Sequence, residues 1–148
     1  NLKRQGITNT NVILNDATVF NSDFENTFDR VLADVPCSGL GVLRRKPDIK
    51  RTKTIDDTKE LAGIQKKIFE NAALYVKKGG MLMYSTCTVL RRENEDVVKA
   101  FLEERSDFCL EPLDLPEVFP KNETGMLTLI PGDYDTDGFF ISRLRRNP

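Results

Sequence analysis

The chain has 148 residues, of which 30% are charged and 39% hydrophobic, and its formal net charge is −1. This composition is typical of one globular domain, and no apolar run approaches the roughly 20 residues of a membrane-spanning helix. The sequence holds no histidine and three cysteines, which excludes histidine-based catalysis and a disulfide framework, makes a metal site unexpected, and favours a reducing cytoplasm.

The start of the chain indicates a piece of a longer protein. No methionine precedes Asn1, and residues 1–6 resemble the tail of a helix closed by glycine. A short apolar run at residues 12–14 then predicts a strand that ends beside Asp16. An aspartate at a strand end either caps the next turn or binds a ligand, and the sequence leaves both open.

Two cysteine-bearing segments each follow a predicted buried strand. The first strand covers residues 28–33 and leads to Cys37, and the second covers residues 81–84 and leads to Cys87. A long helical pattern lies between them, so the strands are expected to be parallel neighbours in one β-α-β unit. Parallel neighbours end at the same edge of a sheet, where open α/β sheets bind ligands. We therefore expect the two cysteines to share a cleft.

The helical pattern begins near Thr54 and a second one covers residues 93–105. The first pattern predicts one buried stripe, formed by Leu61, Ile64, Ile68, Ala72 and Tyr75. Short apolar runs then predict strands at residues 108–110, 126–130 and 139–141, the last two as an antiparallel pair at the sheet edge. The sequence thus predicts one α/β domain over residues 1–148, with a mixed sheet and an antiparallel C-terminal edge.

Cys87 is a candidate nucleophile. It precedes a predicted helix start and the charges of Arg91 and Arg92, and such surroundings favour a thiolate over a thiol. A thiolate reacts without a base partner, which suits a chain that lacks histidine. A buried cysteine that packs as a small hydrophobe is an equally open alternative. Cys109 lies in an edge-strand pattern and is expected to be structural.

The loop after the first strand offers two further candidates. Asp34 ends the strand and can either cap the loop or bind a ligand amine or base edge. Pro36 stiffens the loop and removes one hydrogen-bond donor. The glycines that follow Cys37 permit close approach of the backbone to a ligand.

A basic segment runs from Arg44 to Lys53, close to the Cys37 loop, in a chain that is nearly neutral. Clustered basic side chains suit contact with phosphates such as those of a nucleic acid, whereas the alternative is a solvated linker. The candidate phosphate contacts are Arg44, Arg45, Lys46, Lys50 and Arg51.

Several motifs follow one another in the order of a known family. They are Asp34–Gly39, Gly41–Asp48, Lys78–Gly80, Tyr84–Thr88, Glu93–Glu95 and Asp137–Phe140. Together they resemble the Sun/Fmu-type RNA cytosine-5 methyltransferase family, and the resemblance covers residues 11–145. The paired Pro-Cys and Thr-Cys motifs in this order are its most specific part.

The resemblance implies a Rossmann-like, S-adenosylmethionine-dependent methyltransferase fold and methylation of C5 of a cytosine in RNA, with small-subunit ribosomal RNA favoured. Cys87 would add to C6 of the cytosine, and Cys37 would assist removal of the C5 proton and product release. Asp34 resembles the family's aspartate close to cofactor and cytosine, Asp16 resembles the aspartate beside the adenosine, and Pro36 belongs to the cofactor-binding loop. The target base must leave its stack, so single-stranded or loop RNA is expected.

The sequence departs from the family pattern in its first part. The glycine-rich strand–turn–helix for the methionine end of the cofactor and the acidic strand end for its ribose are absent. In the usual methyltransferase sheet the two missing strands separate those expected at residues 12–15 and 28–33, so we expect an incomplete fold with unpaired edges. We also expect this chain to bind the cofactor weakly, and to re-pair strands or dimerise through an exposed edge.

Other functions remain open from the sequence. A transfer RNA cytosine-5 methyltransferase would carry the same motifs, and a non-catalytic RNA-binding module would use the basic segment alone. Exocyclic-amine methylation calls for an Asn/Asp-Pro-Pro-aromatic loop, which Pro36 and Cys37 do not provide. Uracil-5 enzymes also use a strand-end cysteine, although two cysteines favour cytosine. A dithiol redox protein is disfavoured because the chain has no Cys-x-x-Cys.

Overall fold

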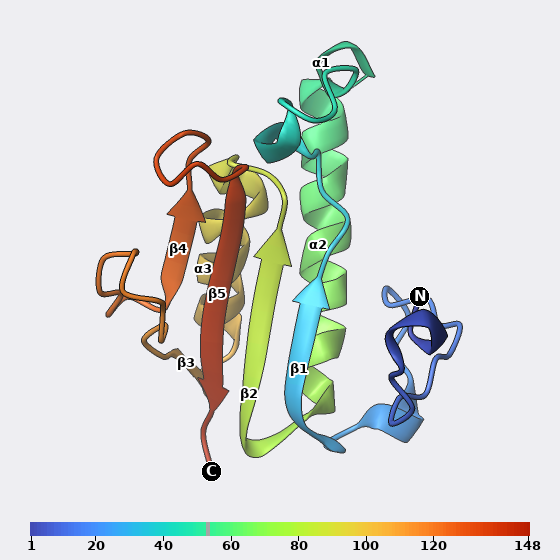
Figure 1. Ribbon diagram of the computed structural model, residues 1–148. Coiled ribbons are helices and arrows are strands. Elements are labelled where there is room, and N and C mark those ends of the chain that lie inside the picture. Colours follow the sequence, from blue (N-terminus) through green and yellow to red (C-terminus); the bar gives the residue numbers. More distant parts are fainter. Residues whose placement is uncertain (53) are drawn as a thin grey trace.

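The computed structural model describes residues 1–52 and 54–148. Within them a five-stranded mixed sheet has the order β1-β2-β5-β3, and β4 pairs with β5 beside this path (Figure 1). The strands are β1 (Phe28–Asp34), β2 (Val76–Thr86), β3 (Phe108–Leu110), β4 (Met126–Leu129) and β5 (Phe139–Arg146). The α-helices are α1 (Ile49–Thr52), α2 (Ile55–Tyr75) and α3 (Glu95–Glu104), and short 3₁₀ helices are η1 (Lys3–Gln5), η2 (Ser22–Phe24), η3 (Leu40–Val42) and η4 (Arg91–Glu93).

The sheet joins one parallel pair to an antiparallel part. β1 and β2 are parallel, and their register places Ala33 opposite Tyr84 and Asp34 opposite Ser85. β5 is antiparallel to β2, β3 and β4. The predicted β-α-β unit and the predicted pairing of the last two strands are therefore confirmed. β5 extends further than expected and lies inside the sheet, because β2 borders it on one side and β3 and β4 on the other.

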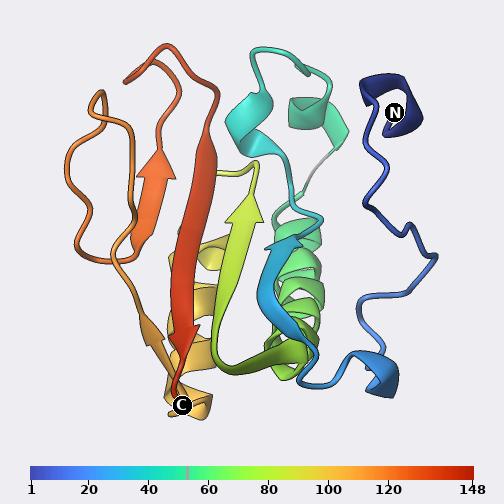
Figure 2. The same ribbon diagram turned by 60° about the horizontal axis from the view of Figure 1, so that its bottom comes forward.

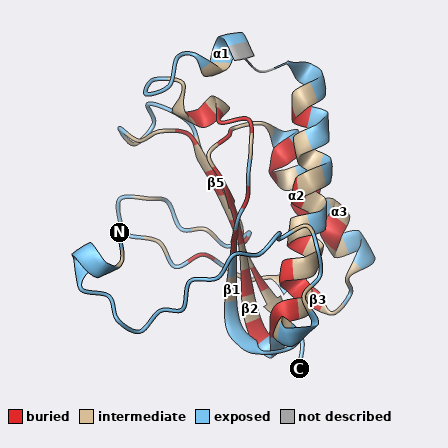
Figure 3. Cartoon of the chain, turned by 90° about the vertical axis from the view of Figure 1, so that its right-hand side faces the viewer, coloured by how far each residue is buried: buried red, intermediate tan, exposed pale blue. Residues whose placement is uncertain are grey.

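Helices α2 and α3 cover one face of the sheet, and the buried residues gather between them and the strands (Figure 3). Phe69 of α2 is fully buried, with its ring centroid 4.8 Å from that of Tyr84 on β2 and 4.4 Å from that of Phe101 on α3. Among the described residues no helix is long and apolar enough to cross a membrane.

The buried stripe of α2 differs in part from the predicted one. Ala72 and Tyr75 are buried as expected, whereas the side chains at positions 61, 64 and 68 are only half-buried. The most deeply buried positions are Gln65, Phe69 and Ala73. The buried face of α2 is rotated about the helix axis relative to the predicted one, because α2 packs against β1, β2 and α3 together. Phe69 therefore lies where these three elements meet.

The predicted strand at residues 12–14 is wrong. These residues have no regular structure, and Val12 and Leu14 are 78% and 105% exposed. A strand forms only by pairing, and in the described part of the chain the outer edge of β1 has no strand partner. The N-terminal segment lies on the side of β1 and α2 that faces away from β5 (Figures 1 and 2). There the Asn71 side chain donates to the carbonyl of Ala17 at 2.9 Å.

The outer edge of β1 is therefore open, as the incomplete fold predicted. Leu32, in the middle of this strand, is 64% exposed. Unpaired strand edges can accept another strand, so dimerisation of this chain through β1 stays a prediction.

Candidate active site

The thiols of Cys37 and Cys87 lie together at the carboxyl ends of β1 and β2. Their Sγ atoms are 3.1 Å apart, and the backbone N–H of Cys87 lies 3.3 Å from Cys37 Sγ, to which it donates. Both side chains are half-buried. The predicted juxtaposition of the two cysteines is thus confirmed, because parallel strands in register deliver both loops to one edge.

The strand ends also fix Asp34. Its Oδ1 accepts a hydrogen bond of 2.8 Å from the Ser85 hydroxyl, and the backbone N–H of Val35 donates to the Ser85 carbonyl at 3.1 Å. The β1–β2 ladder therefore continues to the start of the Cys37 loop. Asp34 remains exposed, so its carboxylate lies at the surface of the carboxyl edge, beside the open side of β1.

A glycine junction joins the Cys37 loop to the Cys87 loop and to β5. The N–H of Gly41 donates to the carbonyl of Cys87 at 3.0 Å, and the N–H of Gly138 donates to the carbonyl of Gly41 at 2.8 Å. A Cβ at Gly41 would overlap the Gly138 carbonyl, and a Cβ at Gly138 would overlap Val89. Glycine is required at both positions because the backbones approach so closely.

Two buried polar side chains hold the backbone on both sides of Cys37. The Gln65 amide donates to the Pro36 carbonyl at 2.9 Å, and Glu93 Oε2 accepts from the Ser38 N–H at 2.8 Å. Gln65 also donates to Glu93 Oε2 at 3.0 Å, which links the two. We call Gln65 and Glu93 the Cys37 clamp. Sequence reasoning missed it, although a glutamine among the inward positions of an apolar helix was a signal.

A similar arrangement holds the residues on both sides of Cys87. The Thr86 hydroxyl donates to Asn94 Oδ1 at 2.6 Å, and the Asn94 amide donates to the Thr88 carbonyl at 3.0 Å. The hydroxyls of Ser38 and Thr88 lie 2.9 Å apart, which connects this network to the Cys37 loop. Both cysteines are therefore attached to buried, hydrogen-bonded backbone, and their separation is fixed.

The two thiols differ in environment. Burial, and then the neighbouring Cys87 thiol, raises the pKa of Cys37 to about 12. Cys37 therefore keeps its proton near neutral pH and is a poor nucleophile. The helix predicted at residues 93–105 is confirmed as α3, which begins at Glu95, eight residues beyond Cys87. A helix dipole acts within its first turn, so it does not explain a reactive Cys87.

We expect alkylation to separate the cysteines of this chain. At pH 8, iodoacetamide should modify exposed Cys109 much faster than Cys37, and the rate at Cys37 should rise steadily toward pH 12. An unfolded thiol ionises near pH 8.5, so the free energy of unfolding should also fall as the pH rises from about 9 to 12. Peptide mass spectrometry over a pH series measures the rates. Equal rates at pH 8 would contradict the raised pKa.

The structure places Asp16 apart from a strand end. Its Oδ1 accepts from the backbone N–H and the hydroxyl of Thr18, at 2.9 and 2.7 Å, and these bonds lower the pKa of its carboxyl. The adjoining Ala17 is tied to Asn71 of α2, whereas the Cys37 loop is tied to Gln65, six residues earlier on that helix. In this structure Asp16 therefore caps a turn.

The basic segment divides into two parts. Arg44 and Arg45 form ion pairs with Asp137, and Arg44 also lies 3.6 Å from Asp135. These pairs hold the loop before β5 against the Cys37 loop, so both arginines are partly neutralised. The remaining described candidates are exposed to solvent: Lys46, Lys50 and Arg51. Lys53, which belongs to the predicted segment, lies outside the described residues.

The site fits part of a methyl-donor cofactor. Asp34 and Pro36 are exposed beside the open edge of β1, so a carboxylate and a rigid apolar ring can contact a ligand next to the thiols. In the residues described, no glycine-rich turn follows a strand on that side, and Asp16 does not join the site. The described residues thus offer contacts beside the thiols and do not form a cradle for the rest of the molecule.

The chain matches the family described as 16S rRNA methyltransferase RsmB/F over residues 1–145. It is 48% identical to a probable ribosomal RNA small subunit methyltransferase B of Bacillus subtilis (strain 168) and 38% identical to a ribosomal RNA small subunit methyltransferase F of Aeromonas salmonicida (strain A449). These alignments cover 97% and 99% of this chain but 33% and 32% of the relatives. The chain therefore spans about a third of the length of the curated relatives it matches.

Two solved structures share the fold. The crystal structure of PH0851 has a TM-score of 0.90 and 32% identity, over 98% of this chain and 33% of that one. NSun6 from Pyrococcus horikoshii, solved with SFG, has a TM-score of 0.78 and 28% identity, over 99% of this chain and 37% of that one. The predicted Rossmann-like fold class is confirmed by this similarity.

Proposed function

The chain belongs to the 16S rRNA methyltransferase RsmB/F family, and from this premise we propose that it forms the catalytic part of an enzyme that methylates C5 of a cytosine in RNA. Small-subunit ribosomal RNA is the favoured substrate, because the curated relatives carry that name. The observation that carries the proposal is the pair of thiols 3.1 Å apart at the carboxyl edge of the sheet.

The two cysteines take different steps. Cys87 Sγ adds to C6 of the cytosine, and the electron pair of the 5,6 double bond moves to C5, which becomes nucleophilic enough to accept a methyl group. S-adenosylmethionine supplies that electrophilic methyl group when bound. Loss of the C5 proton to water, a step that Cys37 assists, then lets the electrons of the C–H bond restore the double bond, and the Cys87 sulfur leaves as a thiolate. Because Cys37 is protonated near neutral pH, it does not compete with Cys87 for C6.

Asp34 and Pro36 would hold the cofactor and the cytosine near the reacting atoms. SFG, an S-adenosylmethionine analogue, accompanies one relative of similar fold, which supports this cofactor. The target base must be unstacked to reach two half-buried sulfur atoms. We therefore propose single-stranded or loop RNA as the form of the substrate.

The activity is tested on the intact protein with labelled S-adenosylmethionine and RNA transcribed in vitro. We expect label in small-subunit ribosomal RNA, and nucleoside analysis should identify it as 5-methylcytosine. Label in transfer RNA alone would show that transfer RNA, and not ribosomal RNA, is the substrate. RNA binding without any transfer would contradict the proposal and indicate a non-catalytic binding module.

We predict that this chain alone binds S-adenosylmethionine weakly, because it lacks the glycine-rich turn and the acidic strand end of the family. Isothermal titration of the 148-residue chain should show no saturable binding below about 1 mM. Asp34→Ala should leave the titration unchanged at that concentration. Saturable micromolar binding by the chain would contradict the prediction.

Removal of Gln65 from the Cys37 clamp is expected to destabilise the fold and to misplace Cys37. Gln65→Leu removes the side-chain donor of the Pro36 carbonyl and one of the two donors of Glu93 Oε2, which keeps the Ser38 N–H. Leaving one buried acceptor unsatisfied costs about 1–3 kcal/mol of unfolding free energy. Because Cys37 is then misplaced, covalent RNA–protein adduct should accumulate in the presence of the cofactor. Phe69→Leu is the matched control, since it weakens the core without touching the clamp. Adduct in neither variant, or in both, would show that Gln65 acts only on stability.

A further inference from the structure

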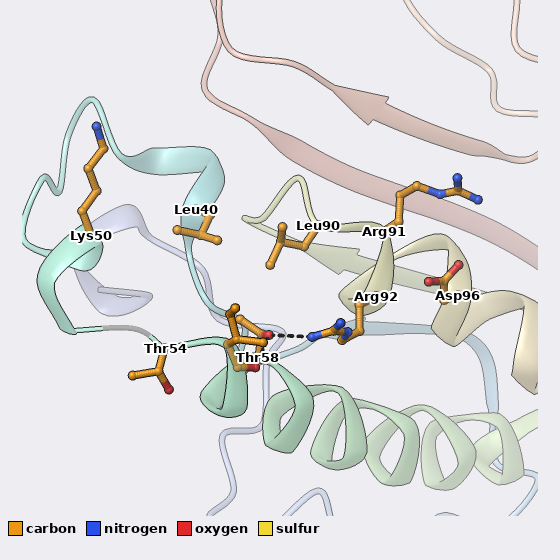
Figure 4. A pocket seen from close by; sticks show the side chains of 9 residues that line it. Leu40, Lys50, Thr54, Thr58, Leu90, Arg91, Arg92 and Asp96 are labelled. Atoms are coloured by element: carbon orange, nitrogen blue, oxygen red, sulfur yellow. Dashed lines mark hydrogen bonds between the residues drawn. The ribbon is translucent and has the colours of Figure 1, made fainter.

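A cavity of about 640 Å³ lies beside the candidate active site (Figure 4). Its wall includes Leu40, three residues beyond Cys37, and Leu90, three residues beyond Cys87. Three residues span at most about 11 Å, so the cavity begins close to both thiols. Neither thiol lines it among the described residues. It is therefore a separate compartment, bounded on its other side by the start of α2.

The cavity combines an apolar wall with a cationic rim. Leu40, Leu90 and Ile55 form the wall, and Ile55, the first residue of α2, is 71% exposed. Packing against the core does not explain an isoleucine at such an exposed position.

The rim is formed by Lys50, Arg91 and Arg92, with Asp96 as the acidic residue of the lining. In the described part of the chain Lys50 and Arg91 make no ion pair, whereas Arg92 donates to the Thr58 hydroxyl at 3.2 Å. Figure 4 shows Lys50 of α1 on one side of the opening and Arg91 and Arg92 of η4 on the other. The rim therefore carries net positive charge. It contrasts with Arg44 and Arg45, whose charges Asp137 offsets.

We infer that this cavity binds a nucleotide of single-stranded RNA that neighbours the target cytosine; the inference rests on the proposed function. A base is flat and largely apolar on its faces, so it suits the leucine and isoleucine wall, and its phosphate suits the cationic rim. The volume lies within the range of pockets that take small molecules. Flipping the cytosine toward the thiols unstacks its neighbours, and a site so close to both cysteine loops receives one of them.

The test is a double-mutant cycle on the intact protein. The protein change is Ile55→Ser, which alters an exposed side chain and leaves the core intact. The RNA change is a single abasic nucleotide, placed in turn at each of the three positions on either side of the target. Each change alone should weaken RNA binding about fivefold to tenfold. At one position the two changes together should weaken binding no more than either alone. Val118→Ser, at an exposed position that does not line the cavity, is the control.

The rim is tested through salt dependence. Arg91→Ala should weaken RNA binding about tenfold and lower the slope of log affinity against log salt by about 1, because one phosphate contact is lost. Lys99→Ala removes an exposed cation outside the cavity and should leave the slope unchanged. An unchanged slope for Arg91→Ala would overturn the inference.

Additive losses at every abasic position would also overturn the inference. Methyl transfer measured on the same wild-type protein and RNA separates this failure from that of the proposed function. If methyl transfer occurs but the losses of RNA affinity are additive, the proposed function stands and the cavity is not an RNA site. A non-additive position without transfer would contradict the function and support the cavity as an RNA site.

Discussion

Cys37→Ala is expected to leave the intact protein covalently attached to its RNA, whereas Cys87→Ala is expected to form no covalent bond. Cys87 makes the bond to C6, and Cys37 assists the step that breaks it, so the two variants should stop the reaction at opposite ends. Methyl transfer over many turnovers should fall by a factor of about 10⁴ in Cys87→Ala. Denaturing gels with labelled RNA and S-adenosylmethionine distinguish the free and attached protein.

The control is Cys109→Ala, since Cys109 is an exposed residue of β3, on the far side of β5 from β2. This variant should behave as the wild type in both adduct formation and turnover. Adduct in Cys87→Ala would assign the nucleophile to another residue. If the wild type and Cys37→Ala accumulated equal amounts of covalent adduct, Cys37 would have no part in releasing the product.

The second large effect is expected at the glycine junction. Gly41→Val places a branched side chain where Cβ alone already overlaps the Gly138 carbonyl and lies 2.9 Å from the Cys87 carbonyl. The Cys37 loop must then leave β5 and lose the hydrogen bonds of Gly41 to Cys87 and Gly138. Overpacking and the two lost bonds together should lower the free energy of unfolding by about 3 kcal/mol or more.

The same change should separate the two thiols. A dithiol reagent such as phenylarsine oxide, which needs both sulfur atoms close together, should bind the wild-type chain and bind Gly41→Val poorly. Gly63→Ala is the control, because a Cβ there meets nothing within 4 Å and alanine favours a helix by about 1 kcal/mol. If Gly41→Val kept the stability and the arsenical binding of the wild type, the glycine junction would be able to accommodate a side chain.

Local sequence patterns determined the β-α-β unit and the place of the thiols. The apolar runs at β1 and β2, with a long helical pattern between them, require a right-handed parallel crossover in almost every case. Residues that follow such strands must then reach the same sheet edge. For this reason Cys37 and Cys87 could be brought together from spacing alone, with Asp34 beside them.

Tertiary structure decided which of those local preferences were fulfilled and which side chains support the site. The apolar run at residues 12–14 has the composition of a strand but no neighbour to pair with, so it stays irregular. Arg44 and Arg45 stand in a basic segment of the sequence, whereas in the fold Asp137, far along the chain, lies beside them and offsets their charge. The Cys37 clamp likewise depends on residues distant in sequence. A sequence pattern reports the conformation that a segment prefers, whereas pairing, ion pairs and clamps depend on groups that only the folded chain brings near.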